Sequence, residues 1–224
     1  FDDAISLERL PNGHWLLGVH IADVSHFVQP KTALDREAHD RATSVYLPDR
    51  VIPMLPEIIS NNLASLQPNK VRYAMTAMIE MTREGVHVAT EVFKSAIKSS
   101  RRFTYEEVDE YLADRKAWAK KLTKEVHSLL TDMHELAMIL RRRRFERGAL
   151  ELTMPELKID LDVDGRVTGA HLEKNTESHQ IIEEFMLSAN VAVAETLADA
   201  GLIFLRRVHG SPDPRKMKVL TEFV

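Results

Sequence analysis

The chain has 224 residues, of which 44% are hydrophobic and 29% are charged, and its formal net charge is −4. This composition is typical of a globular protein with a sizeable core. The absence of cysteine excludes a disulfide scaffold and a thiolate metal site. No segment approaches the ~20 apolar residues that cross a bilayer, and the first residues lack the basic start and apolar run of a signal peptide. We therefore expect a soluble cytoplasmic protein without a membrane partner.

The charged residues are segregated along the chain. Lys and Arg gather at 94–102 and 141–144, whereas Asp and Glu are frequent at the start and at 106–114. A net negative charge disfavours a nucleic-acid partner, because phosphate binding relies on Lys and Arg. The segregation nevertheless fits an enzyme that uses carboxylates for metal and arginines for phosphate. It fits a solvated surface about as well.

Three pairs of apolar segments flank turn residues and predict β-hairpins. The pairs are 5–10 with 15–22, 73–81 with 86–97, and 159–163 with 167–172. The nearly continuous apolar run at 15–22 predicts a central strand covered on both faces. A last strand is predicted at 203–208. Between these elements, three prolines at 45–56 exclude a helix or a central strand and predict a fixed extended segment.

Apolar residues at helical spacing predict two long amphipathic helices, at 117–146 and 181–200, and a short helix lies at 34–41. Thr104 and Glu107 form a capping box at the start of a further helix, and Gly148 ends the first long one. No internal repeat or linker interrupts the pattern. We predict one α+β domain, in which a mixed or antiparallel sheet of hairpins packs against the two long helices.

Asp2 and Asp3 are the first candidates for chemistry. Paired carboxylates suit Mg²⁺, which prefers hard oxygen ligands and assists phosphodiester hydrolysis. From the dipeptide alone, a solvated acidic terminus is the favoured interpretation. His20 lies in an apolar strand, where a hydrogen-bonded core role is favoured over metal binding, and Asp23 is either its partner or a cap for the following turn.

Two tyrosines are candidates for base stacking. Tyr46 stands in the proline-fixed segment, where a rigid aromatic ring suits a stacking platform, although an ordinary core tyrosine is favoured before other evidence is considered. Tyr105, in the first turn of its helix, has the same ambiguity.

Two charged groups on the long helices allow a structural or a functional interpretation. The run Arg141–Arg144 wraps around its helix, so it forms no single phosphate-binding stripe, and relief of the helix dipole is favoured. One acid of the pair Glu183 and Glu184 must lie beside the buried stripe, where it needs a partner or a function. Stabilisation by the helix dipole is the alternative for this pair.

Taken together, these segments resemble the RNB domain of the ribonuclease II/R family, and their sequence motifs are closer to the ribonuclease R branch. The most specific block is Thr-Ser-Val-Tyr-Leu-Pro-Asp-Arg-Val-Ile-Pro-Met-Leu-Pro-Glu at 43–57. The other matching pieces are Phe-Asp-Asp-Ala at 1–4, Val-His-Ile-Ala-Asp-Val-Ser-His-Phe-Val at 19–28, Ser-Asn-Asn-Leu-Ala-Ser-Leu at 60–66, Gly-Ala-Leu at 148–150, Ile-Ile-Glu-Glu-Phe-Met-Leu-Ser-Ala-Asn at 181–190 and Arg-Val-His at 207–209.

The resemblance implies a processive, Mg²⁺-dependent 3′→5′ exoribonuclease that hydrolyses single-stranded RNA to nucleoside 5′-monophosphates. Asp2 and Asp3 match the last two members of the family's D-x5-D-x-D-D cluster, with Asp3 as a metal ligand and Asp2 as a catalytic acid near the metal. Tyr46 matches an aromatic that stacks on bases, Tyr105 a tyrosine at the terminal nucleotide, and Glu183 a glutamate that positions the last ribose.

The resemblance also implies that residues 1–224 are a partial catalytic RNB domain, truncated at both ends and separated from flanking RNA-binding domains. The first two aspartates of the cluster and a C-terminal catalytic arginine would lie outside it, so the 224 residues alone are expected to be inactive. Leu152 falls at about the position of the family's second stacking aromatic, which weakens the clamp around Tyr46. The alternative is a non-catalytic RNA-binding or regulatory domain that retains the fold.

Overall fold

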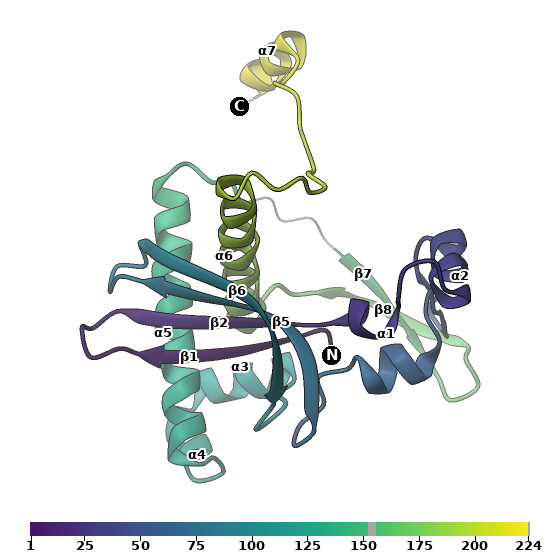
Figure 1. Ribbon diagram of the computed structural model, residues 1–224, viewed down its shortest axis with the longest axis horizontal. Coiled ribbons are helices and arrows are strands. Elements are labelled where there is room, and N and C mark those ends of the chain that lie inside the picture. Colours follow the sequence, from purple (N-terminus) through teal and green to yellow (C-terminus); the bar gives the residue numbers. More distant parts are fainter. Residues whose placement is uncertain (152–155, 224) are drawn as a thin grey trace.

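The computed structural model describes residues 1–151 and 156–223 (Figure 1). The first half contains β1 (Asp3–Arg9), β2 (Trp15–Ala22), α1 (Val24–Phe27), α2 (Ala33–Arg41), β3 (Val45–Tyr46), β4 (Val51–Ile52), the π-helix η1 (Ile58–Leu63), β5 (Val71–Met81) and β6 (His87–Lys98). The second half contains α3 (Tyr105–Ala113), α4 (Arg115–Ala119), α5 (Lys124–Glu146), β7 (Glu156–Leu161), β8 (Val167–Glu173), α6 (Glu177–Asp199) and α7 (Pro214–Phe223).

The main sheet has four antiparallel strands in the order β1-β2-β5-β6. Val19 of β2 pairs with Ile5 of β1 on one side and with Ala77 of β5 on the other. The strands β3–β4 and β7–β8 form two separate hairpins. All three predicted hairpins are therefore confirmed, and the apolar run at 15–22 is a central strand.

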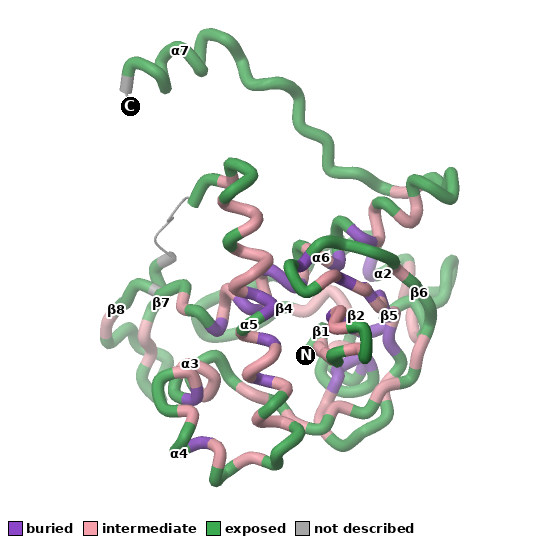
Figure 2. The backbone as a smooth tube through the Cα atoms, turned by 90° about the vertical axis from the view of Figure 1, so that its left-hand side faces the viewer, coloured by how far each residue is buried: buried purple, intermediate pink, exposed green. Residues whose placement is uncertain are grey.

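The core lies where one face of the sheet meets α5 and α6, which are the two predicted long helices (Figures 1 and 2). Trp15, Leu17 and Val19 of β2 are almost completely buried there, with Leu136 of α5 and Phe185 of α6. The α+β prediction is thus confirmed. Coverage of β2 is unequal, however, because Leu16 and His20 on its other face are only half-buried.

The predicted helix at 117–146 is wrong in one respect, since the chain breaks into α4 and α5. Thr123 begins α5 as its N-cap, and its hydroxyl accepts a hydrogen bond from the Val126 amide at 3.3 Å. An N-cap residue has non-helical backbone angles, so it cannot continue the preceding helix. The apolar stripe runs on across the break, because Trp118 and Leu130 are both buried, and periodicity alone therefore hides it.

The predicted last strand at 203–208 is also wrong. Ile203 and Leu205 are fully exposed, residues 203–213 have no regular secondary structure, and the short helix α7 follows. In Figure 1 this C-terminal segment extends away from the sheet. An apolar run becomes a strand only when a neighbouring strand accepts its hydrogen bonds, and none of the described strands pairs with it.

The proline-rich segment 45–56 contains neither a helix nor a central strand, as predicted. It forms the two-residue ladder β3–β4, in which Tyr46 pairs with Val51, and both side chains are exposed. None of the described helices has the length and apolar character that crossing a membrane requires.

Candidate functional site

The acidic pair lies at the start of β1, where backbone hydrogen bonds hold it on two sides. The Ala22 amide donates to the Asp2 carbonyl at 2.8 Å, and the Leu66 amide donates to the Phe1 carbonyl at 2.8 Å. Asp3 enters the sheet opposite Ile21. The backbone of this dipeptide is therefore fixed between β2 and the segment that follows η1.

The electrostatics of this pair favour a bound cation. The Asp3 side chain is still exposed, but loss of part of its hydration raises the pKa of its carboxyl, and the neighbouring charge of Asp2 raises it further. A divalent cation would offset both effects, and hard carboxylate oxygens suit Mg²⁺. Within residues 1–151 and 156–223, no group of three or more His, Cys, Asp or Glu side chains has metal-binding geometry. The described chain can thus offer Mg²⁺ this acidic pair, and the ion would fill its remaining positions with water or phosphate oxygens.

His20 is a hydrogen-bonded structural residue, as favoured from the sequence. Its Nε2 lies 2.9 Å from Ser6 Oγ and its Nδ1 lies 2.8 Å from Thr76 Oγ1. Asp23 is a cap, because its carboxylate accepts a hydrogen bond from the His26 amide at 3.2 Å. The Ser25 hydroxyl, more than the nearby Lys94, lowers the pKa of the Asp23 carboxyl.

Tyr46 is not a core residue. Its side chain is 78% exposed on the β3–β4 ladder, next to the exposed Val45 and Leu47. The structure therefore rules out the core interpretation of this tyrosine and leaves its ring accessible for stacking.

Tyr105 is part of a contact between α3 and α6. The Thr104 capping box is present as predicted, and it places Tyr105 in the first turn of α3. The Tyr105 ring stacks on the His179 ring, with centroids 3.8 Å apart and an interplanar angle of 17°. The Ser178 amide also donates to Asp109 Oδ1 at 3.3 Å, which ties the two helices together. The sequence did not identify His179, whose only signal is its position one turn before Glu183.

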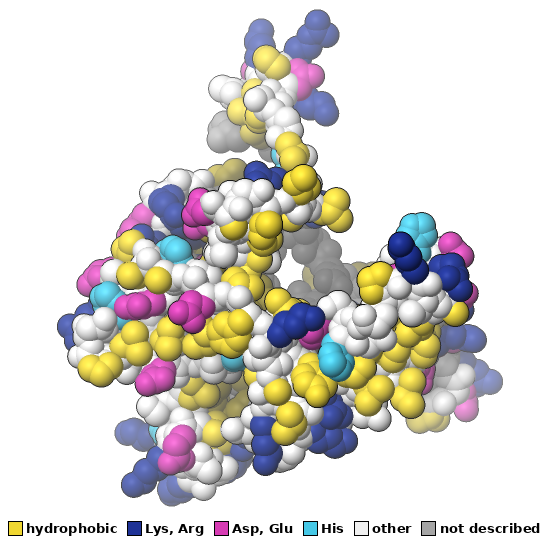
Figure 3. Space-filling model, in the orientation of Figure 1, with side chains coloured by type: hydrophobic (Ala, Val, Ile, Leu, Met, Phe, Trp, Pro, Cys, Tyr) yellow, Lys and Arg dark blue, Asp and Glu magenta, His cyan; other side chains and the backbone are white. Residues whose placement is uncertain are grey.

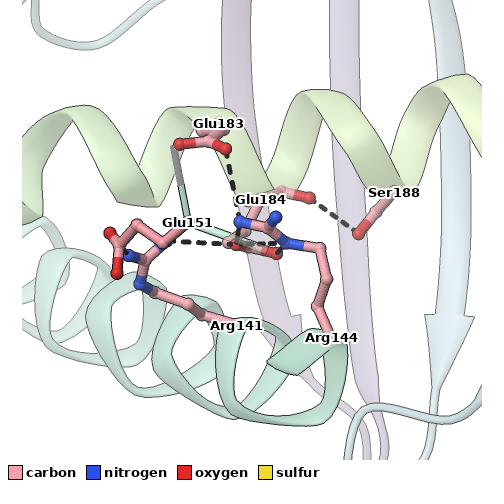
Figure 4. Close-up of polar contacts among 6 residues, drawn as sticks. All are labelled: Arg141, Arg144, Glu151, Glu183, Glu184 and Ser188. Carbon is pink, nitrogen blue, oxygen red and sulfur yellow. Dashed lines mark hydrogen bonds and ion pairs between the residues drawn. The ribbon is translucent and has the colours of Figure 1, made fainter. Parts of the chain in front are cut away.

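The two acids at 183 and 184 have different environments (Figure 4). The Glu184 side chain is 3% exposed and accepts hydrogen bonds from Arg144 at 3.0 Å and 2.7 Å. The Glu183 side chain is 41% exposed and receives one contact from Arg144 Nη2 at 3.3 Å. Glu184 is thus the acid beside the buried stripe, and its partner is Arg144.

Two members of the arginine run form ion pairs that the sequence did not indicate, although the run lies at the C-terminal end of α5 as the helix-dipole interpretation expects. Arg144 is paired with Glu184, and Arg141 pairs with Glu151 and lies 3.9 Å from Glu184 (Figure 4). Hydrogen bonding to Glu184 raises the pKa of the Arg144 guanidinium. These arginines join the C-terminal turns of α5 to α6 and to the chain that follows Gly148.

The predicted site residues fall into separate groups. Tyr105 and Glu183 lie near each other, because His179 contacts the tyrosine and precedes Glu183 by four residues on the same helix face. Asp2 and Asp3 lie at the start of β1, and Tyr46 lies on the β3–β4 ladder. Leu152 is outside the described residues.

The model of the RNB domain matches residues 1–224, and the chain belongs to this family. Ribonuclease R of Thermotoga maritima is 47% identical over 225 residues, which cover 100% of this chain and 31% of that protein.

Solved structures agree with this assignment. Mycoplasma genitalium RNase R in complex with double-stranded RNA matches with a TM-score of 0.92 and 30% identity, over 99% of this chain and 39% of that one. The same protein in complex with ribose methylated single-stranded RNA also matches with a TM-score of 0.92, over 99% of this chain and 34% of that one. The chain thus spans about a third of the length of the curated relatives it matches.

Proposed function

We propose that this chain is part of the catalytic domain of a processive 3′→5′ exoribonuclease that degrades single-stranded RNA in the presence of Mg²⁺. The observation that carries the proposal is the acidic pair held at the start of β1 within an RNB-family fold, because two adjacent carboxylates can anchor a divalent cation. Relatives named ribonuclease R, and RNase R structures that contain RNA, support RNA as the substrate.

In this proposal Asp3 is a metal ligand and Asp2 is a catalytic acid that lies close to the metal and can also bind it. Bound Mg²⁺ supplies an activated water and stabilises the charge that develops on the phosphate and the leaving oxygen. Mg²⁺ bound in proteins usually keeps several waters and is held by one or two carboxylates together with substrate phosphates, so this pair is a suitable anchor.

The other residues hold the RNA. Tyr46 stacks on a base, because its exposed ring offers a face that any base can cover. Tyr105 contacts the terminal nucleotide, and Glu183 accepts a hydrogen bond from the last ribose with a carboxylate that is still partly open to solvent. The products are nucleoside 5′-monophosphates.

The proposal is tested on the full-length gene product with single-stranded RNA labelled at either end. With 3′-labelled RNA, the label should appear at once in a mononucleotide. With 5′-labelled RNA, the labelled molecule should shorten progressively. An excess of unlabelled RNA, added after the enzyme has bound, should not stop the degradation of molecules already bound. EDTA should stop both reactions. Internal cuts, or activity in EDTA, would contradict the proposal. RNA binding without degradation would instead establish a non-catalytic RNA-binding domain.

A further inference from the structure

The adjacent acids Glu183 and Glu184 of α6 differ in burial, and this difference decides which of them can bind a ligand. Glu184 cannot reach a ligand in solvent, because its side chain is 3% exposed and both of its oxygens face Arg144. Glu183 is 41% exposed, and a single contact with Arg144 leaves most of its lone pairs available. Glu183 alone of the two can therefore accept a hydrogen bond from a substrate.

Arg144 connects the two acids through its forked guanidinium. Its Nε lies 3.0 Å from Glu184 Oε1, and its Nη2 lies 2.7 Å from the same oxygen. The same Nη2 lies 3.3 Å from Glu183 Oε1. Figure 4 shows this guanidinium between the two carboxylates, with Arg141 on the other side of Glu184. The position of Glu183 is thus coupled to an ion pair whose carboxylate, that of Glu184, is buried.

A buried ion pair is a poor means of gaining stability, because well-packed apolar residues at such positions often do as well or better. The pair of Arg144 and Glu184 instead fixes the orientation of the Arg144 guanidinium. Two nitrogens of one rigid, planar group bind Glu184, so the orientation of Arg144 is fixed, and a lysine could not reproduce this fork.

We propose that Arg144, held by Glu184, is a positioning residue that sets the carboxylate of Glu183 for the hydroxyls of the 3′-terminal ribose. The arrangement thereby contributes to the preference for a ribose over a deoxyribose end. This inference rests on the role proposed above for Glu183. Arg141 strengthens it, because its pairing with Glu151 closes the far side of the cluster.

The test compares two oligonucleotides in the full-length gene product. One is a single-stranded RNA, and the other is identical except for a single 2′-deoxynucleotide at the 3′ end. The quantity measured is the single-turnover rate at which the last nucleotide of the RNA is removed, divided by the same rate for the oligonucleotide with the 3′ deoxynucleotide. Glu183→Gln should lower this ratio on the order of tenfold, since a hydrogen bond to a charged acceptor is lost.

Arg144→Lys should lower the ratio by a similar factor, and the double variant should lower it no further than either single one. Arg142→Lys is the matched control, because it changes the same residue type at an exposed position of the same helix. It should leave both the ratio and the melting temperature unchanged. If Arg144→Lys fails to fold, Glu184→Gln replaces it, because a neutral amide holds the guanidinium less firmly, and this variant should also lower the ratio.

The outcomes separate this inference from the proposed function. If Glu183→Gln lowers the ratio while Arg144→Lys and Glu184→Gln change only the melting temperature, the pair is structural and the inference is wrong, although the proposed function stands. If Glu183→Gln leaves the ratio unchanged, the role of Glu183 fails and the inference fails with it. If the unaltered protein removes no 3′ nucleotides, the proposed function itself is wrong.

Discussion

The hydroxyl of Ser6 lies 2.9 Å from Nε2 of His20, across the first two strands of the sheet. His20 Nδ1 continues to Thr76 Oγ1 at 2.8 Å, and this hydroxyl lies 2.6 Å from Ser95 Oγ. One chain of polar contacts therefore crosses β1, β2, β5 and β6 in turn. Both ring nitrogens of His20 are engaged, and burial lowers its pKa below the ordinary 6.5.

His20 should make the folded state less stable in mild acid. Because its folded pKa lies below 6.5, the folded state binds fewer protons than the unfolded chain between that pKa and 6.5. Stability should thus fall as the pH drops through this window. His20→Gln removes the titrating group, so its melting temperature should fall less between pH 7.5 and 5.5. His39→Gln, at a side chain that is 88% exposed, is the control. Parallel curves for the three proteins would exclude this role for His20.

Gly18 should not tolerate a side chain. A Cβ at this position would lie 2.3 Å from Ser6 Oγ and 2.9 Å from Met78 Sδ. Gly18→Ala should therefore displace Ser6, break its hydrogen bond to His20 and destabilise the protein by about 1–3 kcal/mol, as overpacking usually does. Thermal unfolding measures the effect. Gly210→Ala, where a Cβ meets nothing within 4 Å, is the control, and equal melting temperatures for both variants would disprove the clash.

Local signals predicted most of the fold. Asn12-Gly13 marks the first hairpin, and Gly13 has the positive φ of 84° that its turn requires. Thr104 and Glu107 form the capping box that their spacing indicates. The failures at 120–123 and 203–208 have one cause, since hydrophobic pattern reports which residues are apolar and not where a backbone hydrogen-bond ladder stops.

The candidate site was harder to predict, because its contacts join residues that are distant in the chain. Arg144 and Glu184 are 40 positions apart, and no spacing rule pairs them. Tyr105 and His179 likewise come from helices whose packing is set by the whole core. The sequence did indicate that one acid at 183–184 needed a partner, and only the structure identified which acid and which partner.

Asp3→Asn should stabilise the metal-free protein and abolish catalysis. The raised pKa of Asp3 means that partial loss of hydration and the charge of Asp2 both disfavour the ionised carboxylate, so a neutral amide relieves this cost. The melting temperature without Mg²⁺ should therefore rise, whereas RNA hydrolysis should fall at least about 10²-fold if charge at this position holds the metal.

Glu8→Gln, at an exposed position of the same strand, is the control for the effect of removing a carboxylate. Added Mg²⁺ should raise the melting temperature of the unaltered protein and of Glu8→Gln, but not that of Asp3→Asn, because a ligand that binds only the folded state stabilises it. An Asp3→Asn variant with normal activity would show that Asp3 is not a metal ligand.

Tyr46→Ala should weaken the binding of RNA without affecting the fold. The ring is 78% exposed, so its removal costs almost no core packing, and the melting temperature should stay within the small range of ordinary surface substitutions. A lost stacking contact is worth ~1–3 kcal/mol per base, which should appear as a higher Kd for short single-stranded RNA and a longer final product.

Tyr46→Phe keeps the stacking face and should behave like the unaltered protein. Because Asp2 and Asp3 lie on another element, bond cleavage should persist in Tyr46→Ala at saturating RNA. An unchanged Kd and end product would reduce Tyr46 to a surface residue of the β3–β4 ladder.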